Sequence, residues 1–202
     1  MIDSTLQGEP MKQLVIYGAS EFGKVVKTFA ESSGSDVRGF IDDWHSGADV
    51  VGGCETLLRE FSPQKFDIAM AIGYRHQDER WNIYCRLKNE GYRFPALVHP
   101  RAIVDPTASV ADGVFIMAGA IVDARATIEP LAVAWPGAIV NHDSTIGTNT
   151  FLGPGAIVCG RTSVGHGCFI GAGAVVTDHL IVPPKTFIKA ADRYSDHKTS
   201  GT

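Results

Sequence analysis

The sequence lacks the features that mark nucleic-acid-binding, membrane and secreted proteins. Its 18 Lys and Arg are outnumbered by 22 Asp and Glu, and the net charge of −4 offers no positive surface for nucleic acid or an anionic membrane. No apolar run approaches the roughly 20 residues that span a bilayer. The start, MIDSTLQGEPMKQ, has neither the basic nor the apolar segment of a secretory signal. We therefore expect a cytoplasmic protein, with residues 1–10 as a flexible leader.

Cysteine is sparse as well, and no two cysteines stand at CxxC spacing. This scatter predicts reduced thiols and no metal site. A length of 202 residues with 45% apolar content is suited to one large or two small globular domains. The four cysteines are Cys54, Cys85, Cys159 and Cys168.

Residues 11–97 predict a small α/β domain. Short apolar runs alternate with segments of helical periodicity, an order that is typical of a parallel sheet covered by helices. An apolar run at residues 12–17 stops at Gly18, and the helical segment after it ends at Gly34. Further strands are expected at residues 37–41, 66–72 and 96–99, and further helices at residues 55–61 and 78–89.

The ends of these strands predict a binding site. Ligands of parallel sheets bind beyond the C-terminal strand ends, where Gly18, Asp42, Asp43 and Gly73 should converge. The loop after Gly18 opens a helix, whose free N–H groups can receive a phosphate. Ser20 replaces the middle glycine of the G-x-G-x-x-G fingerprint, and this disfavours a dinucleotide. The loop is then either a plain strand–helix turn or a site for a mononucleotide or nucleotide sugar.

From Ala102 onward a six-residue period replaces this pattern. A large aliphatic residue recurs at every sixth position, and a small residue usually stands two places before it. A strict period of six predicts a triangular parallel β-solenoid with about 18 residues in each coil. We expect it over residues 98–182, in roughly four coils, with a tail at residues 183–202 that covers the open end. The repeated positions hold Val104, Val110, Ile116, Val122, Ile128, Ala134, Val140, Ile146, Leu152, Val158, Val164, Ile170 and Val176.

His142 and Asp143 occupy variable positions of one hexad and are the catalytic candidates. An adjacent acid can orient an imidazole and stabilise its cation. One coil of about 18 residues later stands Gly160, so the residue stacked on His142 has no side chain. This arrangement leaves room for a substrate beside a general base, with backbone N–H groups near a developing oxyanion. Cys159 is discounted as a nucleophile, because neighbouring Val158 and Gly160 offer no charge to lower its pKa.

The other histidines indicate no function. A zinc site of the kind that some β-solenoids hold needs three histidines, two of them five residues apart. His142, His166 and His179 include no such pair, and His99 is expected to be structural at the junction of the two domains. The remaining histidines fall in expected loops or in the tail: His45, His76 and His197.

The hexads resemble the left-handed β-helix of the hexapeptide-repeat acyltransferases. With the N-terminal half included, residues 12–176 are similar to bacterial sugar acetyltransferases of the sialic acid O-acetyltransferase and nucleotide-4-aminosugar N-acetyltransferase type. This resemblance implies a Rossmann-like α/β domain, a left-handed parallel β-helix and a homotrimer with active sites between subunits. The motifs are YGAS-x-x-GKVV (17–26), FIDD (40–43), AIG (71–73) with Arg80 downstream, VHP-x-A (98–102) and VNHD-x-x-IG (140–147).

The resemblance also implies roles for individual residues. His142 and Asp143 match the catalytic histidine–acid pair of that family. Glu21-Phe22 stands where many members of the family have Gly-His, and Trp135-Pro136 stands where Asn-Thr is frequent. Phe151 stands where some members place a second histidine. Nucleotide-sugar contacts are expected from Gly18, Ser20, Glu21, Phe22, Asp42, Asp43, Gly73, Arg80 and Trp135. Acetyl-CoA contacts are expected from Phe151, Gly160, Ala172 and Ala190.

We therefore predict an acetyl-CoA-dependent N-acetyltransferase that needs no metal. Its acceptor would be the amino group of a nucleotide-linked 4-amino-deoxysugar in bacterial surface-glycan biosynthesis. The sequence does not distinguish UDP, dTDP and GDP as the nucleotide. Two alternatives stay open: a sugar O-acetyltransferase on the same fold, and a non-catalytic protein that binds sugar nucleotides.

Overall fold

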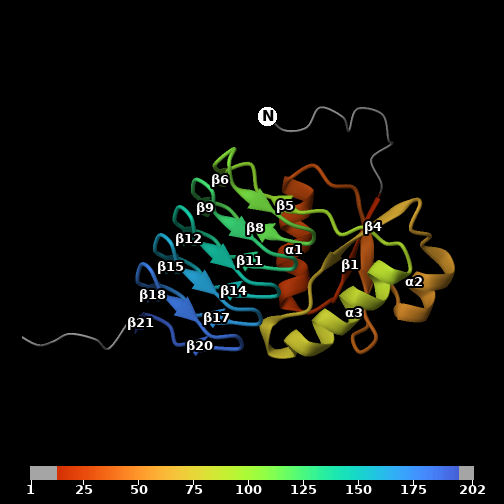
Figure 1. Cartoon of the computed structure of the whole chain (residues 1–202). Helices are drawn as coiled ribbons and strands as arrows, with labels where there is room; N and C mark the ends of the chain where they lie inside the picture. The colour runs from red at the N-terminus through yellow and green to blue at the C-terminus, as the bar shows by residue number, and fades with distance from the viewer. Residues whose placement is uncertain (1–12, 196–202) are drawn as a thin grey trace, which may run out of the picture. The chain divides into compact units, whose positions relative to one another are not determined.

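A computed structural model describes residues 13–195 of the chain (Figure 1). These residues divide between Pro100 and Arg101 into two compact units. The leader expected at residues 1–10 and the last part of the expected tail, residues 196–202, lie outside the described residues. No helix within residues 13–195 is long and apolar enough to cross a membrane.

A four-stranded parallel sheet forms the core of the N-terminal unit. Its order is β3-β2-β1-β4, so β1 is central, and Val15 and Ile16 on it are fully buried. Helix α1 follows β1 and buries Val26, Phe29 and Ala30 on one apolar face, although Val25, which the same periodicity includes, is 42% exposed. The elements are β1 (Gln13–Tyr17), α1 (Glu21–Ser32), β2 (Val37–Ile41), β3 (Val50–Gly52), α2 (Cys54–Glu60), β4 (Phe66–Met70), the 3₁₀ helix η2 (Tyr74–His76) and α3 (Gln77–Asn89).

The strand expected at residues 96–99 is not part of this sheet. A two-residue strand, β5 (Leu97–Val98), does form there, but the four-stranded sheet does not include it. The backbone at Arg93 takes the place beside β4 instead, because its carbonyl accepts a hydrogen bond of 2.9 Å from the Ile68 amide. The short strand β3 was not predicted, since its three residues are too few to show a period.

The turn between β1 and α1 depends on two glycines. Gly18 has φ +112°, in a region that residues with a side chain rarely adopt, and a Cβ there would lie 2.7 Å from the Ala71 carbonyl oxygen. A Cβ on Gly23, inside α1, would collide with the Gly18 carbonyl. The first turn of the helix therefore lies directly against the end of the strand, which brings Ser20 close to the ends of β2 and β4.

The C-terminal unit is a parallel β-solenoid of about 5 turns. Each strand pairs with the strand one coil away, as Thr127 pairs with Thr145, so residues 18 apart are stacked. The strands are β6 (Ile103–Val104), β7 (Ser109–Val110), β8 (Phe115–Ile116), β9 (Ile121–Val122), β10 (Thr127–Ile128), β11 (Val133–Ala134), β12 (Ile139–Val140), β13 (Thr145–Ile146), β14 (Phe151–Leu152), β15 (Ile157–Val158), β16 (Ser163–Val164), β17 (Phe169–Ile170), β18 (Val175–Val176), β19 (Ile181–Val182), β20 (Phe187–Ile188) and β21 (Arg193–Tyr194).

The strands form three faces. The first face holds β6-β9-β12-β15-β18-β21, the strands labelled along one edge of the solenoid in Figure 1. The second face holds β7-β10-β13-β16-β19, and the third holds β8-β11-β14-β17-β20. The second residue of nearly every strand fills the core together with the small residue two places before it, as the six-residue period predicted.

The solenoid is longer than expected. The solenoid was predicted to end at residue 182, with a separate tail from residue 183, but β20 and β21 continue the coils to Tyr194. Val182 and Ile188 are buried in the same core as the earlier repeats. The sequence concealed this continuation because Leu180 and Asp192 stand in the slots where the earlier hexads have small residues.

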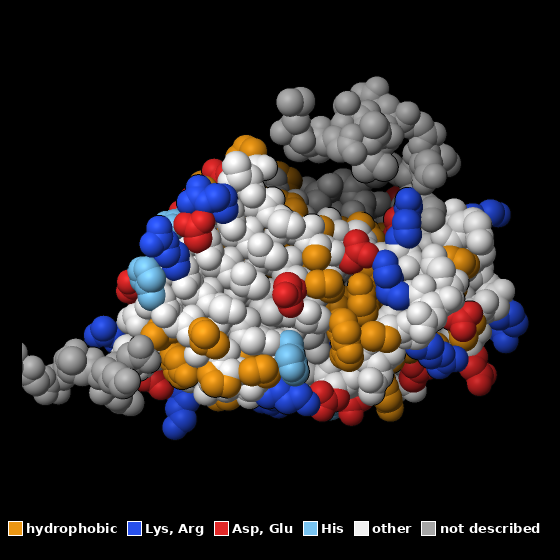
Figure 2. Space-filling view, viewed as in Figure 1, with side chains coloured by type: hydrophobic (Ala, Val, Ile, Leu, Met, Phe, Trp, Pro, Cys, Tyr) orange, Lys and Arg blue, Asp and Glu red, His pale blue; other side chains and the backbone are white. Residues whose placement is uncertain are grey.

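The last coils carry exposed apolar side chains. The rings of Phe169 and Phe187 stack on the third face with centroids 5.0 Å apart, and Phe187 is 61% exposed. Ile181 on the second face is 79% exposed. Figure 2 shows hydrophobic side chains gathered over this end of the solenoid.

Candidate functional site: a histidine–aspartate corner and an N-terminal cavity

His142 and Asp143 lie at a corner of the solenoid between the first and second faces, which we call the histidine corner. Asp143 has φ +58°, a left-handed conformation that aspartate tolerates at turns. Its Oδ2 lies 2.8 Å from Nδ1 of His142, whose side chain is 48% exposed. A carboxylate at this distance favours the proton on Nδ1 and therefore an unprotonated Nε2. The corner thus presents a candidate general base to solvent.

Gly160 lies one coil beyond His142 at the same corner, as the stacking of residues 18 apart predicted. A Cβ at this position would lie 2.9 Å from both Cε1 and Nε2 of the imidazole. The coils are joined there by a hydrogen bond of 3.0 Å from the Arg161 amide to the His142 carbonyl. The imidazole therefore occupies the space beside Gly160 that any other residue would fill.

Arg125, one coil before Asp143, completes the group and was not predicted. Its Nε and Nη2 donate to Oδ1 and Oδ2 of Asp143 at 2.6 and 2.9 Å. The hydrogen bonds from Arg125 and His142 hold the pKa of the Asp143 carboxyl well below its usual range. Arg125 stands 18 residues before Asp143, so the 18-residue spacing would have placed it next to Asp143. In the sequence, that spacing was followed only forward, from His142 to Gly160.

The other residues expected to contact acetyl-CoA lie elsewhere on the solenoid. Ala172 and Ala190 are exposed at the corner between the third and first faces, and Trp135 lies at that corner too. We call it the tryptophan corner. Phe151 is on β14 of the third face and is buried. Within one chain, the first face separates Trp135 from the histidine corner.

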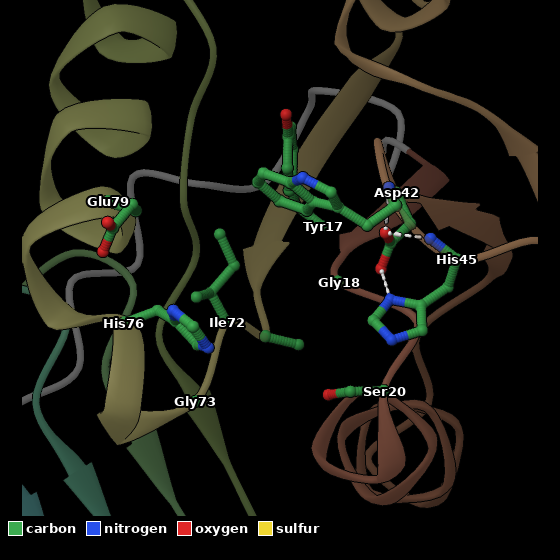
Figure 3. A pocket seen from close by; sticks show the side chains of 11 residues that line it. Tyr17, Gly18, Ser20, Asp42, His45, Ile72, Gly73, His76 and Glu79 are labelled. Atoms are coloured by element: carbon green, nitrogen blue, oxygen red, sulfur yellow. Dashed lines mark hydrogen bonds and ion pairs between the residues drawn. The ribbon is translucent and has the colours of Figure 1, made fainter.

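The N-terminal unit holds a cavity of about 520 Å³ at the C-terminal ends of its strands (Figure 3). Four residues predicted for a nucleotide sugar line it: Gly18, Ser20, Asp42 and Gly73. The other lining residues are Tyr17, Trp44, His45, Ala71, Ile72, His76 and Glu79. Of these, His45 and His76 had given no functional signal, because a loop position does not reveal where a side chain points.

Asp42 organises one wall of this cavity. Its Oδ1 accepts hydrogen bonds from the amides of Trp44 and His45, both at 2.8 Å. Its Oδ2 accepts from the Ala19 amide at 2.7 Å and lies 3.0 Å from Nδ1 of His45, an interaction drawn in Figure 3. Burial alone would raise the pKa of this carboxyl, but these hydrogen bonds lower it. Asp42 therefore joins the Gly18 loop to the Trp44 loop.

Besides Trp135 of the solenoid, four predicted contact residues of the N-terminal unit do not line the cavity. Asp43 accepts instead from the Tyr17 hydroxyl at 2.6 Å and from the Cys54 amide at 2.8 Å. Burial and this bond to Asp43 raise the pKa of Tyr17. Arg80 is fully buried, donates to the Met70 carbonyl at 3.3 Å, and has its pKa lowered by burial to about 9. The remaining two are Glu21 and Phe22.

No cluster of three His, Cys, Asp or Glu residues in the described part of the chain is arranged to hold a metal ion. The described residues instead offer an imidazole supported by a carboxylate in the solenoid and a ligand-sized cavity in the N-terminal unit.

Both units of the chain are similar to known protein families. Residues 13–87 match the PglD N-terminal domain, and residues 143–178 match the bacterial transferase hexapeptide repeat. The acetyltransferase domain of PglB from Neisseria gonorrhoeae FA1090 is 28% identical, with a TM-score of 0.85 over 94% of each chain. The chain is therefore similar, over nearly its whole length, to an acetyltransferase domain that matches it in both units.

Two further structures identify ligands of similar proteins. The PglB acetyltransferase domain is known in complex with acetyl coenzyme A, and that structure matches with a TM-score of 0.83 over 93% of this chain and 94% of that chain, at 28% identity. PerB from Caulobacter crescentus, in complex with CoA and GDP-perosamine, is also 28% identical. Its TM-score is 0.85, and the match covers 92% of this chain and 90% of PerB. Both acetyltransferases therefore share the arrangement of an N-terminal α/β unit followed by a solenoid.

Proposed function

We propose that this protein transfers the acetyl group of acetyl-CoA to the amino group of a nucleotide-linked amino-deoxysugar. The observation that supports this proposal best is the His142–Asp143 pair beside Gly160, in a chain that matches acetyltransferases over more than 90% of its length. The cavity at Ser20, Asp42 and Gly73 supports a nucleotide as the second half of the substrate. The product would serve the synthesis of bacterial surface glycans in the cytoplasm.

The reaction needs one base. The amine nitrogen attacks the thioester carbonyl carbon, and backbone N–H groups near Gly160 stabilise the oxyanion of the tetrahedral intermediate. Nε2 of His142 takes a proton from the amine as the C–N bond forms, while Asp143 stabilises the imidazolium. The C–S bond then breaks, and the imidazolium returns the proton to the CoA thiolate. No covalent acyl-enzyme is required.

A homotrimer would complete this site. The histidine corner and the tryptophan corner lie on opposite sides of the first face, so one chain does not bring their residues together. The outward positions of the first face form an aliphatic row: Ile103, Ile121, Ile139, Ile157 and Val175. A row of this kind supports packing against another copy, because solvent-facing apolar rows are unfavourable in a monomer. Three copies would then join the two kinds of corner.

The proposal is tested with the full chain, acetyl-CoA and the UDP-, dTDP- and GDP-linked 4-amino-deoxysugars. Transfer should release CoA thiol and yield a sugar that carries a stable N-acetyl group, and sedimentation should give a trimer. A His142→Asn variant should lose about 10²- to 10⁴-fold in kcat while its affinity for the nucleotide sugar is kept.

Other outcomes would contradict the proposal. An acetyl ester that hydroxylamine cleaves would indicate an O-acetyltransferase, and binding of sugar nucleotides without thiol release would indicate a non-catalytic protein. If the His142→Asn variant kept its kcat to within about tenfold, His142 would not be the base.

A further inference from the structure

Arg125 forms a bidentate contact with Asp143 from one coil below. Both side-chain oxygens of Asp143 are used, and Oδ2 is shared between Nη2 of Arg125 and Nδ1 of His142. Parallel hydrogen bonds of this kind fix the plane and the rotation of a carboxylate, which a single charge does not. The oxygen that faces the imidazole is therefore held by the arginine.

The backbone around Arg125 is itself fixed. Arg125 has φ +58°, and its amide donates to the Thr107 hydroxyl at 3.0 Å. That hydroxyl donates in turn to Asp105 at 2.6 Å. On the next coil, the Asp143 amide donates to the Ala124 carbonyl at 3.0 Å. Each partner of the contact is thus attached to a neighbouring coil, and the distance between them is set by the solenoid.

An exposed ion pair by itself contributes little to stability, so stability does not explain this geometry. The carboxylate of Asp143 is at a solvent-facing corner, where it could otherwise rotate away from the imidazole toward water. Arg125 stays charged there, because the hydrogen bond to Asp143 and the nearby charges of Asp143, Asp105 and Asp123 raise its pKa. The contact is therefore suited to orientation.

We propose that Arg125 is a positioning residue, which acts through Asp143 to hold His142 with its proton on Nδ1 and its Nε2 ready to accept a proton. This inference rests on the proposed function, in which Nε2 is the base. It adds a third member to the pair that the sequence predicted, and it assigns no contact with substrate to Arg125.

The test is a double-mutant cycle in the full-length protein. Arg125→Ala should lower kcat by about tenfold, with KM for acetyl-CoA and for the nucleotide sugar within about twofold of the original values. In an Asp143→Asn background, the same Arg125→Ala change should have no further effect, because the group through which it acts has gone. Added guanidinium should restore part of the activity of Arg125→Ala, and Arg125→Lys should lose less than Arg125→Ala.

Lys185→Ala is a matched control. Lys185 is also an exposed cation with φ +58° at a different corner, so its loss imposes the same backbone change without touching Asp143. Its kcat should stay within about twofold of the original, and the Tm of both variants should fall by no more than about 3 °C.

Nitrogen NMR of His142 gives a readout that is independent of turnover. In the original protein the neutral imidazole should carry its proton on Nδ1, and in Arg125→Ala the share with the proton on Nε2 should increase. Additive losses of kcat in the cycle, a rise in KM for acetyl-CoA at constant kcat, or unchanged tautomers would each overturn the positioning role. If the original protein transferred no acetyl group, the proposed function would fail, and the NMR comparison would still decide whether Arg125 sets the tautomer.

Discussion

Replacing Gly160 with alanine should separate catalysis from stability. The new Cβ would lie 2.9 Å from Cε1 and Nε2 of His142, whereas carbon atoms in contact are normally about 3.5–4.0 Å apart. The imidazole would have to move by roughly 0.6–1 Å. Because it is the end of a half-exposed side chain, it can do so without disturbing the coils. A displacement of this size costs up to about 10²-fold in rate.

We therefore expect Gly160→Ala to lower kcat by about 30- to 100-fold while Tm changes by no more than about 3 °C. Initial rates of CoA thiol release and thermal unfolding measure the two quantities. Gly147→Ala provides the contrast, because its Cβ would lie 2.6 Å from backbone atoms of Gly165 and His166, which cannot move aside. That variant should unfold at a clearly lower temperature.

Gly47→Ala is the matched control, since a Cβ there meets no atom within 4 Å and its φ is ordinary. It should change neither rate nor stability. A Gly160→Ala variant with kcat within threefold of the original would refute the argument that the space beside Gly160 is needed by the imidazole.

Two further predictions concern the carboxylates. Asp42→Asn should raise KM for the nucleotide sugar by about tenfold at nearly unchanged kcat. The reason is that an amide cannot accept all four hydrogen bonds that join the two loops. A roughly tenfold fall in kcat at unchanged KM would contradict this prediction. The pKa of Asp143 is depressed in the folded protein. The contribution of its ionised carboxylate to the free energy of unfolding is therefore fully present above the unfolded pKa, and it is lost as pH falls through the lower folded pKa. The Asp143 carboxylate should therefore stay ionised between about pH 5 and 8 and add no limb of its own to the profile of kcat/KM against pH; an acidic limb with a slope of two in this range would count against it.

The sequence predicted the solenoid, and with it the corner that holds the candidate pair His142 and Asp143, because the six-residue period fixes which side chains are stacked. Gly160 could be placed beside His142 by counting one coil forward. Counting one coil backward from Asp143 would have found Arg125, but whether an arginine bends toward the next coil depends on rotamers that the period does not determine.

The N-terminal cavity was predicted less completely. Strand ends located Gly18, Asp42 and Gly73, since parallel strands end at the same edge of a sheet. Trp44, His45 and His76 follow in loops, whose backbone direction no hydrophobic pattern specifies. Arg80 was expected to contact the ligand because its position matches a motif of the resemblance, yet here its guanidinium is fully buried and donates to the Met70 carbonyl at the end of β4.

The 18-residue register between coils has a consequence for how this site can change. Every coil offers the same corner in nearly the same backbone conformation, about 4.8 Å from the next. A base moved from residue 142 to residue 124 or 160 would therefore shift along the solenoid by one whole step and keep its orientation. Evolution or design can thus adjust the distance between the base and a bound sugar only in steps of one coil.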